Sequence, residues 1–400
     1  MKILVLNCGS SSIKYKLFDM PEKKELSSGG IEKIGLADSF LKYKTIIGET
    51  KFIHKPIAEH TQGVELILSI LRESSGNTIK TFADIDAVGH RVVHGGDKFK
   101  KSTIINQEVV DDIKECYDLA PLHNPANMKG IEAISKILPK VPQVAVFDTA
   151  FHQTMHPHAY MYALPYEYYT KYGVRRYGFH GTSHKYVAKR ACKFLGLNLS
   201  NSRLITAHIG NGGSITAIKN GQSIDTSMGM TPVEGLMMGS RSGNIDLGVL
   251  TYLMDKEKLT TKQISDIINK KSGLQGISGI SSDMRDIQKA IAEGNERAHL
   301  ALEMYLYYLL KYVSGYIAVL GGVDAIVFTG GVGENQPVLR KYICENLKFL
   351  GLDFNDELNE NSYGKEVALS FPTSKIHVAV IPTDEELAIA TDTEEILSGK

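Results

Sequence analysis

The sequence predicts an α/β protein of two domains that arose by internal duplication. Strand-like apolar runs alternate with helical stretches along 400 residues, a length that exceeds what one hydrophobic core usually organises. The segment KILVLNCGSSSIKYKLF gives a strand, a tight polar turn and a second strand, and RLITAHIGNGGSITAIKNGQSID repeats this arrangement far downstream. One such hairpin in each half indicates a duplication, and we place the domain boundary near Ala150.

Helices and further strands are expected between and after the two hairpins. Hydrophobic periodicity predicts helices at 62–72, 127–138, 184–194, 261–270 and 298–320. Strands are expected at 87–93, 144–147, 325–328 and 378–381, and the last three end directly in polar or glycine residues. Ligands of α/β sheets gather at such strand ends, so the functional residues are sought there.

Composition favours a small-molecule partner in a reducing, cytoplasmic setting. Forty-five basic residues balance forty-five acidic ones, so no excess charge would draw the chain to nucleic acid or to a membrane surface. The first apolar run has only four residues, which fits a strand and not a signal peptide. The apolar stretch 298–320 carries Glu303 and Lys311, which favours a buried helix with surface to spare for a subunit interface. The four cysteines lie far apart, without the spacing of a zinc site or a disulfide framework.

Two glycine-rich and hydroxyl-rich loops are candidates for phosphate binding. The first, Asn7 to Ser12, offers backbone N–H groups, hydroxyls and an amide oxygen within one turn, which suits phosphate oxygens and Mg²⁺. A hairpin turn chosen for its conformation is the alternative. The downstream copy, His208 to Ser214, shifts the balance toward function because two such loops can hold a nucleotide's phosphates from both sides.

A third glycine run, Thr329 to Asn335, follows the strand at 325–328 and precedes a helical pattern. Glycine there lets the backbone approach a flat or anionic ligand closely. The chain contains no Gly-Lys-Ser or Gly-Lys-Thr, so a P-loop kinase is excluded, and the run does not match a Rossmann fingerprint.

Two arginines are candidate anion clamps. Arg91 stands in HRVVHGG near a strand end and Arg241 stands among small residues in GSRSG. A guanidinium binds carboxylate or phosphoryl oxygens through a two-pronged fork, although a surface salt bridge is the alternative for either one. Asp148 ends an apolar strand and could be catalytic or cap a helix. His180 and His184 have the spacing of a zinc pair without the glutamate of HExxH, which favours phosphate binding or a structural role over metal ligation.

The segment Thr383-Asp384-Glu385-Glu386 is expected to open the last helix. Thr383 and Glu386 form a capping-box pattern, which gives Glu386 a structural role. Glu385 has no such explanation and follows directly on the strand at 378–381. A carboxylate there could hold Mg²⁺, usually through water.

These motifs together resemble the acetate kinase (acetokinase) family, a branch of the acetate and sugar kinase, Hsp70 and actin superfamily. LNCGSSSIK and the stretch from His208 through Gly248, which includes DTSMGMTPVEGLMMGSRSGNIDLG, follow that family's signatures, and the resemblance covers essentially the whole chain. It implies two duplicated actin-like ATPase (ribonuclease H-like) domains with a cleft between them. The first would span residues 1–150 plus 384–400, and the second, 151–383, would carry the nucleotide site and the interface of a homodimer.

The resemblance also implies roles for individual residues. Asn7 and Glu385 would organise Mg²⁺, for which Mn²⁺ can substitute. Arg91 and Arg241 would grip the carboxylate and the phosphoryl group, and His180 would stabilise the transferring group. Asp148 would position the attacking carboxylate or the water shell of the metal. ATP or ADP would be held by Ser10, Ser12, Lys14, His208, Ile209, Gly210, Asn211 and Gly212 at the phosphates, and by Asp283, Met284, Arg285, Gly331, Val332, Gly333, Glu334 and Asn335 at the adenosine. The acyl group would be bound by Val93, Leu122, His123, Phe179 and Pro232.

The implied activity is acetate kinase: reversible in-line transfer of the ATP γ-phosphoryl group to acetate, which gives acetyl phosphate and ADP. Propionate or another short carboxylate is the alternative acceptor, and Val93 favours acetate. Two rival functions remain open at this point. An actin-like or Hsp70-like ATPase shares the loops but gives no reason for paired arginines beside a small apolar pocket, and a sugar kinase would need an aspartate base and a wide polar pocket.

Overall fold

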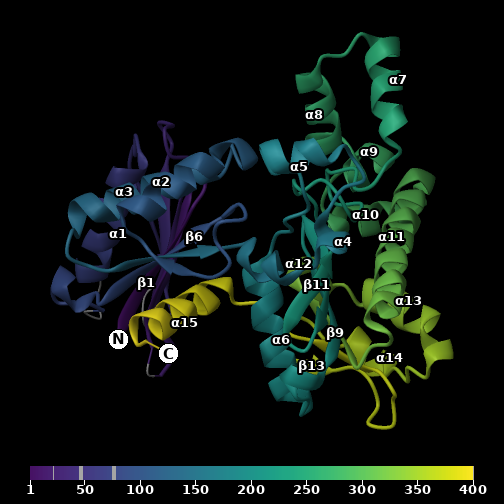
Figure 1. The fold of residues 1–400 in the computed structure, drawn as a ribbon. Coiled ribbons are helices and arrows are strands. Elements are labelled where there is room, and N and C mark those ends of the chain that lie inside the picture. Colours follow the sequence, from purple (N-terminus) through teal and green to yellow (C-terminus); the bar gives the residue numbers. More distant parts are fainter. Residues whose placement is uncertain (21, 45–47, 74–77, 400) are drawn as a thin grey trace. The chain divides into compact units, whose positions relative to one another are not determined.

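A computed structural model describes residues 1–20, 22–44, 48–73 and 78–399. The chain forms two compact units, Met1–Phe151 with Asp384–Lys400 and His152–Thr383. Each unit is built on one sheet with helices on its faces (Figure 1). Among the described residues no helix is both long and apolar enough to cross a membrane.

The sheet of the first unit combines parallel strands at its centre with antiparallel strands at one side. Its order is β5-β4-β3-β2-β1-β6-β8-β7, in which β1, β6 and β8 run parallel. The strands are β1 Lys2–Cys8, β2 Ile13–Asp19, β3 Lys24–Glu32, β4 Phe40–Lys44, β5 Thr50–His54, β6 Ala87–Val92, β7 Thr103–Ile104 and β8 Gln143–Phe147. The parallel centre brings the carboxyl ends of β1, β6 and β8 to one edge.

Helices cover both faces of that parallel centre, because β1 alternates its apolar side chains between the faces. Leu4 and Leu6 pack with α1 and α3, whereas Ile3 and Val5 pack with α15. Figure 1 shows α15 on the face opposite α1 and α3. The helices and 3-10 turns are α1 His60–Glu73, α2 Gln107–Glu115, α3 Asn124–Ile137, α15 Glu385–Leu397, η1 Phe82–Asp84, η2 Cys116–Leu119 and η3 Ala150–Thr154.

The second unit repeats this plan. Its sheet has the order β11-β10-β9-β12-β14-β13, with β9, β12 and β14 parallel. The strands are β9 Arg203–Ile209, β10 Gly213–Lys219, β11 Gln222–Thr226, β12 Ala325–Thr329, β13 Val367–Ala368 and β14 His377–Val380. Asn220 and Gly221 join β10 to β11 with φ of 54° and 79°, the left-handed pair that a two-residue type I′ hairpin turn requires.

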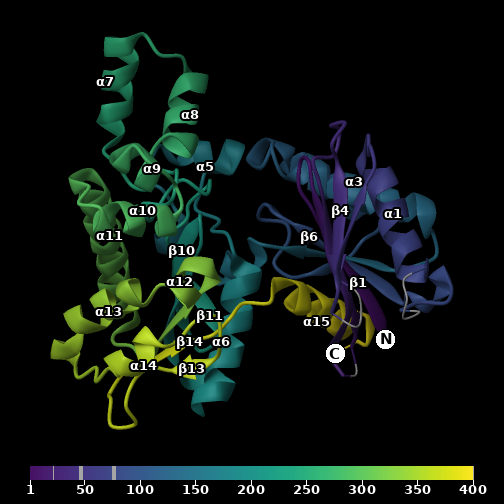
Figure 2. The ribbon, with the colours of Figure 1, turned by 180° about the vertical axis from the view of Figure 1, so that it is seen from behind.

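The long helix α11 contributes more buried residues than any other helix to the core on one face of the second sheet, and α6 covers the other face. Figure 2 shows α11 beside α9, α10 and α13. The helices and 3-10 turns are α4 Pro157–Tyr160, α5 Tyr166–Tyr172, α6 Gly181–Leu195, α7 Leu247–Glu257, α8 Thr261–Lys270, α9 Gly273–Ser278, α10 Met284–Ala292, α11 Glu296–Leu320, α12 Gly330–Asn335, α13 Pro337–Asn346, α14 Asp356–Glu360, η4 Leu199–Asn201 and η5 Lys348–Leu350.

The expected helices and strands are all present, with boundaries shifted by a few residues. Two local predictions were wrong. The glycine run after β12 is itself the helix α12, which begins at Gly330, where a φ of 78° turns the chain out of the strand. The last helix is capped by Asp384, whose side chain accepts from the Leu387 N–H at 3.1 Å, and not by Thr383 with Glu386. Thr383 instead places its hydroxyl 2.8 Å from that of Ser183.

Candidate functional site

The parallel strands of the first unit bring three predicted residues into direct contact. The neighbours Leu6 and His90 pair across β1 and β6, so the next residues along these strands, Asn7 and Arg91, lie side by side. Asp148 follows β8, the next strand in the sheet. Arg91 Nη2 donates to Asp148 at 2.6 Å and its Nε donates to the same carboxylate at 3.1 Å, while Nη1 lies 3.4 Å from Asn7 Oδ1.

This ion pair is a fork on a carboxylate that is 2% exposed. Burial alone would lower the pKa of Arg91, but the carboxylates of Asp148 and Glu385 outweigh burial and raise it. Asp148 is therefore held in one orientation by the arginine, and the strand-end aspartate does not cap a helix.

Glu385 joins these three residues from the first position of α15. Burial is the main cause that raises its pKa to about 7, with a further contribution from the Asp148 carboxylate, while Arg91 and Lys14 oppose the rise. Lys14 pairs with Asn7 across β1 and β2 and so shares its face of the sheet. We call Asn7, Arg91, Asp148 and Glu385 the strand-end cluster.

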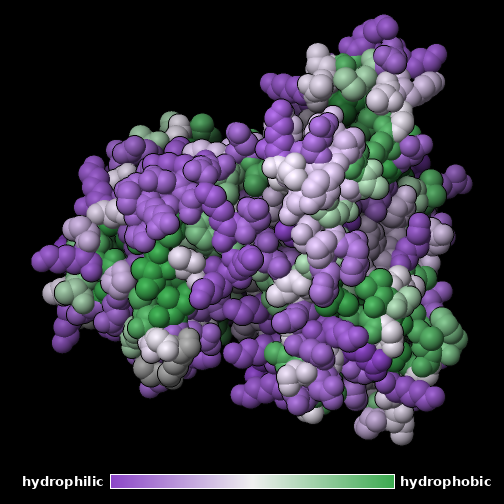
Figure 3. Space-filling view, in the orientation of Figure 1, coloured by the Kyte–Doolittle hydropathy of each residue, from purple (hydrophilic) through white to green (hydrophobic). Residues whose placement is uncertain are grey.

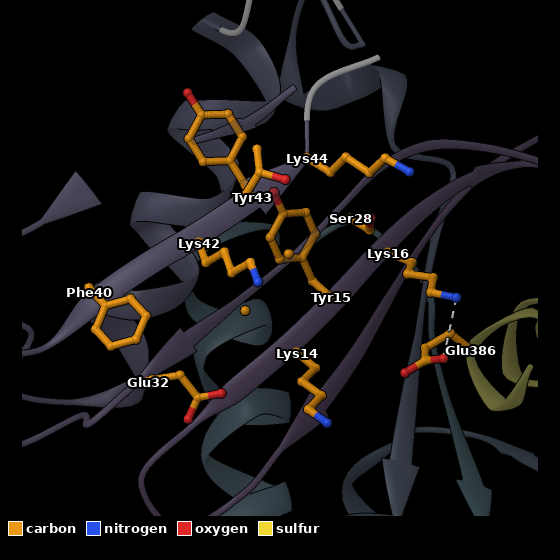
Figure 4. Close-up of a pocket in the computed structure, with 13 residues that line it drawn as sticks. Lys14, Tyr15, Lys16, Ser28, Glu32, Phe40, Lys42, Tyr43, Lys44 and Glu386 are labelled. Atoms are coloured by element: carbon orange, nitrogen blue, oxygen red, sulfur yellow. Dashed lines mark ion pairs between the residues drawn. The ribbon is translucent and has the colours of Figure 1, made fainter. Parts of the chain in front are cut away.

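Lys14 also lies at a cavity of about 440 Å³ on the open side of β2, β3 and β4. Figure 4 shows Lys14, Lys16 and Lys42 around it, with Lys16 directed toward Glu386 on α15. Lys16 is tied to Glu386 at 3.5 Å and to Asp384 at 3.0 Å, so it fixes the start of α15. This contact holds Glu385, which lies between those two acids, at the edge of the sheet.

The donor set of the strand-end cluster suits a hard divalent cation. Asn7, Asp148 and Glu385 supply amide and carboxylate oxygens, the ligands that Mg²⁺ prefers. Burial, with a smaller contribution from the Asp148 carboxylate, raises the pKa of Glu385, so the surrounding protein compensates the ionised form incompletely. A bound cation would supply the missing compensation.

The first predicted phosphate loop is a compact turn whose hydroxyls face outward. The Gly9 N–H donates to the Ser12 carbonyl at 2.8 Å, and the Gly9 carbonyl accepts from His60 Nε2 at 2.7 Å. Ser10 is exposed and Ser12 is half-buried. The loop therefore leaves both hydroxyls accessible to an anion.

The residues predicted to bind the acyl group fall in both units. Val93 is buried after β6, with its N–H donating to Asn127 Oδ1 at 3.1 Å. Leu122 is 73% exposed, and His123 is the residue at which α3 begins. Phe179, which is buried, and Pro232 belong to the second unit.

A stack of histidines marks the second unit. His180 has a φ of 57°, uncommon outside glycine, at the start of α6. Its ring stacks on that of His208 with centroids 4.3 Å apart, and its Nδ1 lies 2.9 Å from Ser214 Oγ. His184 is buried between the hydroxyls of Thr206 and Ser214, so this member of the i, i+4 pair has a structural role. Such backbone strain at His180 is typical of functional positions.

Arg241 differs from Arg91 because no carboxylate of the described residues pairs with it. Its Nη1 donates to the Pro232 carbonyl at 3.3 Å and lies 3.9 Å from Met238 Sδ. Burial lowers its pKa. A side-chain carbon added at Gly212 would come within 3.1 Å of the same nitrogen, so the guanidinium borders the second phosphate loop. A half-buried cation beside a glycine loop, with no carboxylate partner among the described residues, is suited to bind an anion.

A cavity of about 450 Å³ gathers half of the residues predicted to hold the nucleotide. Figure 2 shows α10 and α12, two of the elements that contribute to it. Its lining comprises Gly210, Asn211, Gly239, Leu274, Ser282, Asp283, Met284, Arg285, Tyr305, Gly331, Val332, Asn335 and Gln336. Gly210 in the second phosphate loop and Gly331 in α12 leave room for a flat ligand. We call this space the glycine-lined cavity.

Asp283 caps α10 and pairs with Arg285, whose Nη2 donates at 2.6 Å. This hydrogen bond lowers the pKa of Asp283 to about 2. The pair thus presents an ionised carboxylate and a guanidinium at the rim of the cavity.

Several predicted nucleotide residues do not line the glycine-lined cavity. Ile209 is fully buried, His208 directs Nδ1 to Ser183 Oγ at 2.8 Å, and Gly212 borders Arg241. Gly333 is also buried. Glu334 accepts from the Gly330 N–H at 2.9 Å and from the Thr383 N–H at 3.2 Å, which is a structural role.

Other lining residues were missed from the sequence. Gly239 is the first residue of GSRSG, which was considered only for its arginine, and Ser282 directly precedes Asp283, so closer attention to these motifs would have found both. Leu274 and Tyr305 arrive from α9 and α11 through tertiary packing, and no local signal marks them.

Comparison with known proteins agrees with the motifs. The sequence profile of the Acetokinase family matches residues 2–391. The chain is 60% identical over 397 residues to an acetate kinase of Bacteroides thetaiotaomicron, covering 99% of this chain and 100% of that one. Among solved structures it is similar to Porphyromonas gingivalis acetate kinase (58% identity, TM-score 0.96, 99% of both chains) and to a propionate kinase of Francisella tularensis (42% identity, TM-score 0.90, 98% of this chain and 99% of that one). The chain belongs to the acetokinase family.

Proposed function

We propose that the protein is an acetate kinase that transfers the γ-phosphoryl group of ATP reversibly to acetate by direct in-line displacement, giving acetyl phosphate and ADP. The observation that carries this assignment is Arg241, a half-buried guanidinium without a carboxylate partner beside the glycine loop of the second unit. Relatives at 58–60% identity that bear the name acetate kinase support it.

In this proposal the second unit binds the nucleotide. The glycine-lined cavity, of about 450 Å³, takes the adenosine between α10 and α12, and the loop from His208 to Gly212 meets the phosphates. His180 and Arg241 place positive or hydrogen-bonding groups where charge builds up on the equatorial oxygens. Lys14, Ser10 and Ser12 of the first unit also bind the phosphates in this proposal.

Acetate is the nucleophile in this proposal, and it needs no general base. Its acidity is close to that of a side-chain carboxylate, so it is already ionised at neutral pH. Asp148 accordingly acts on Arg91, which it orients through the two-pronged contact. Arg91 then meets the acetate carboxylate, and Val93, Leu122, His123, Phe179 and Pro232 surround its methyl group.

Asn7 and Glu385 would hold Mg²⁺, or Mn²⁺ in its place. When bound, the ion neutralises charge on the phosphate oxygens. Asp148, which shares Arg91 as a partner with Asn7, would orient the ion's water shell.

Propionate is the second candidate acceptor, favoured by the likeness at 42% identity to a solved propionate kinase. One methylene changes binding by about 1–3 kcal/mol, so propionate should be used more slowly and not refused.

We further propose a cytoplasmic homodimer formed through the second unit. Figure 3 shows apolar side chains on the surface of that unit where α11 and α13 lie in Figure 1. Leu300, Tyr307 and Val319 on α11 are 49–55% exposed. Exposed apolar side chains on one helix are typical of a surface that binds another protein chain. The four cysteines are free and buried, consistent with a reducing compartment.

Incubation with ATP, acetate and hydroxylamine tests the assignment. A carboxylate kinase yields acetyl hydroxamate in an acetate-dependent manner, whereas an ATPase releases phosphate independently of acetate. A panel of formate, acetate, propionate, butyrate and glycerol then ranks the acceptors. Phosphate release without hydroxamate, or a preference for glycerol, would refute the proposal.

A further inference from the structure

The loop that carries Pro232 is held by a half-buried ion pair to which the sequence assigned no role. Residues 228–235, here the Pro232 loop, reverse the chain after β11. Glu234 near its end accepts from Arg176 Nη2 at 2.6 Å and from the Tyr162 hydroxyl at 2.5 Å. That hydroxyl in turn accepts from the Met230 N–H at 2.8 Å. The Glu234 carboxylate therefore fastens both ends of the loop.

Arg176 also holds the strand from which the loop departs. Its Nη1 donates to the carbonyls of Thr226 and Ser227 at 2.7 and 3.1 Å, with that of Met228 at 3.4 Å. The Glu234 carboxylate raises the pKa of Arg176 against the opposing effect of burial. One side chain thus joins the end of β11 to the far side of the loop.

The same residue begins the segment that leads to Phe179 and His180. The N–H groups of Tyr177 and Gly178 both donate to the Gly229 carbonyl at 3.1 Å. A side-chain carbon added at Gly229 would lie 1.8 Å from Glu234 Oε2, so the Pro232 loop packs tightly against the Glu234 carboxylate. A change in the position of Arg176 must therefore move the Pro232 loop relative to Phe179.

Arg241 depends on this loop as well, because its Nη1 donates to the Pro232 carbonyl. The arginine clamp (Arg176, Glu234 and Tyr162) therefore fixes three groups assigned above: the Phe179 and Pro232 walls of the acyl pocket and the direction of the Arg241 guanidinium. None of the three clamp residues touches substrate in this assignment, so they act through others.

We propose that Arg176, through its ion pair with Glu234, is a positioning residue that sets the spacing between Phe179 and Pro232 and hence the preference for acetate over longer carboxylates. This inference rests on the proposed function. Loosening the clamp lets the Pro232 loop drift, which weakens the grip on a methyl group more than it weakens the grip on an ethyl group. The nucleotide residues lie on other elements and should be unaffected.

The test compares Arg176→Met with Arg176→Lys and Tyr162→Phe. We measure kcat and KM for acetate, propionate and ATP, and the melting temperature. Arg176→Met should raise KM for acetate at least tenfold and lower the acetate-to-propionate ratio of kcat/KM at least fivefold, with KM for ATP within twofold of wild type. Arg176→Lys should recover part of the ratio because it restores the charge opposite Glu234. Tyr162→Phe removes one hydroxyl only and should shift the ratio in the same direction, which keeps the test decisive if Arg176→Met fails to fold.

Arg203→Met is the matched control, because Arg203 forms a comparable pair with Asp324 at 2.8 Å in the same unit without touching the Pro232 loop. It should leave the ratio unchanged. A folded Arg176→Met or Tyr162→Phe variant with the wild-type ratio would overturn the positioning role, as would an equal rise in KM for ATP. Failure of the proposed function is distinguishable, since the wild-type protein would then form no hydroxamate.

Discussion

Replacing Arg241 by alanine should separate catalysis from stability. The Arg241 guanidinium is half-buried, and its recorded contacts are a carbonyl at 3.3 Å and a thioether at 3.9 Å. Removing one pre-placed donor for a developing charge costs about 2.7–4 kcal/mol, or roughly 10²–10³ in turnover. A guanidinium can present more than one donor, so we take a loss of about 10² as the lower bound.

The effect on folding should be small by comparison. Losing the hydrogen bond to Pro232 costs about 0.5–1.5 kcal/mol. This loss is offset because the variant no longer buries a cation that lacks a carboxylate partner, a burial that itself lowers the pKa of Arg241. We therefore expect the free energy of unfolding to change by less than about 1 kcal/mol.

The assay is hydroxamate formation at saturating ATP and acetate, together with thermal and urea unfolding. Arg297→Ala is the matched control, since Arg297 also donates to a carbonyl, that of Ile277 at 2.8 Å, but on the exposed side of α11. The control should keep wild-type turnover. Turnover of Arg241→Ala within fivefold of wild type would refute the anion-binding role.

Three further predictions concern other parts of the structure. Arg91→Ala leaves the Asp148 carboxylate, 2% exposed, without its partner, so unlike Arg241→Ala it should lose about 3–5 kcal/mol of stability as well as turnover, and the double change with Asp148→Ala should recover part of that stability. Burial lowers the pKa of His90 to about 4, below its unfolded value, so its contribution to stability is fully present above pH 6.5 and is lost, by up to about 3 kcal/mol, as pH drops toward 4. Urea titrations should find this slope reduced in His90→Gln. Gly239→Ala would place a carbon 2.0 Å from Asn211 Oδ1 in the glycine-lined cavity, so KM for ATP should rise about tenfold or more while KM for acetate stays within twofold.

The outcomes that contradict these predictions are equally specific. If Arg91→Ala and Arg241→Ala lose the same stability, the pairing with Asp148 is not the cause. His54→Gln, a change at an exposed histidine of the same unit, should keep the wild-type acid slope, and an equal loss of slope in both histidine variants would count against His90. A Gly239→Ala variant with unchanged KM for ATP would place the adenosine elsewhere.

Local patterns in the sequence were sufficient for the elements of the fold. The alternation in Ile13, Tyr15 and Leu17 put one face of β2 in the core, and Asn220-Gly221 marked the hairpin from β10 to β11. The prediction that Thr383 caps α15 was wrong, because local sequence does not show which of two adjacent capping residues is used. Thr383 and Asp384 are both good caps, and the choice was made by Ser183 and Lys16, which contact them from distant parts of the chain.

The arrangement of the site residues was predictable only where parallel strands end together. Arg91 and Asp148 follow neighbouring strands, so their meeting is a consequence of strand order. The sequence could not reveal that Arg91 is paired and Arg241 is not, because that difference depends on which carboxylates lie near each one. The arginine clamp was missed for the same reason: Arg176 and Glu234 are separated along the chain, and nothing in the local sequence shows that they pair.

The duplication explains why the two units have come to carry different chemistry on the same frame. In both sheets the first strand pairs with an antiparallel neighbour, and the polar residue just before its end, Asn7 or His208, faces Lys14 or Ser214 across that pair. In both, the residue after the third parallel strand donates its N–H to the adjacent strand at 3.1 Å, but this residue is Asp148 in one unit and Ile381 in the other. A carboxylate at this position allows the first unit to orient Arg91 and to offer oxygen to a cation. The second unit has an apolar residue at this position, and its candidate anion-binding group, Arg241, has no carboxylate partner among the described residues and is available to an anion.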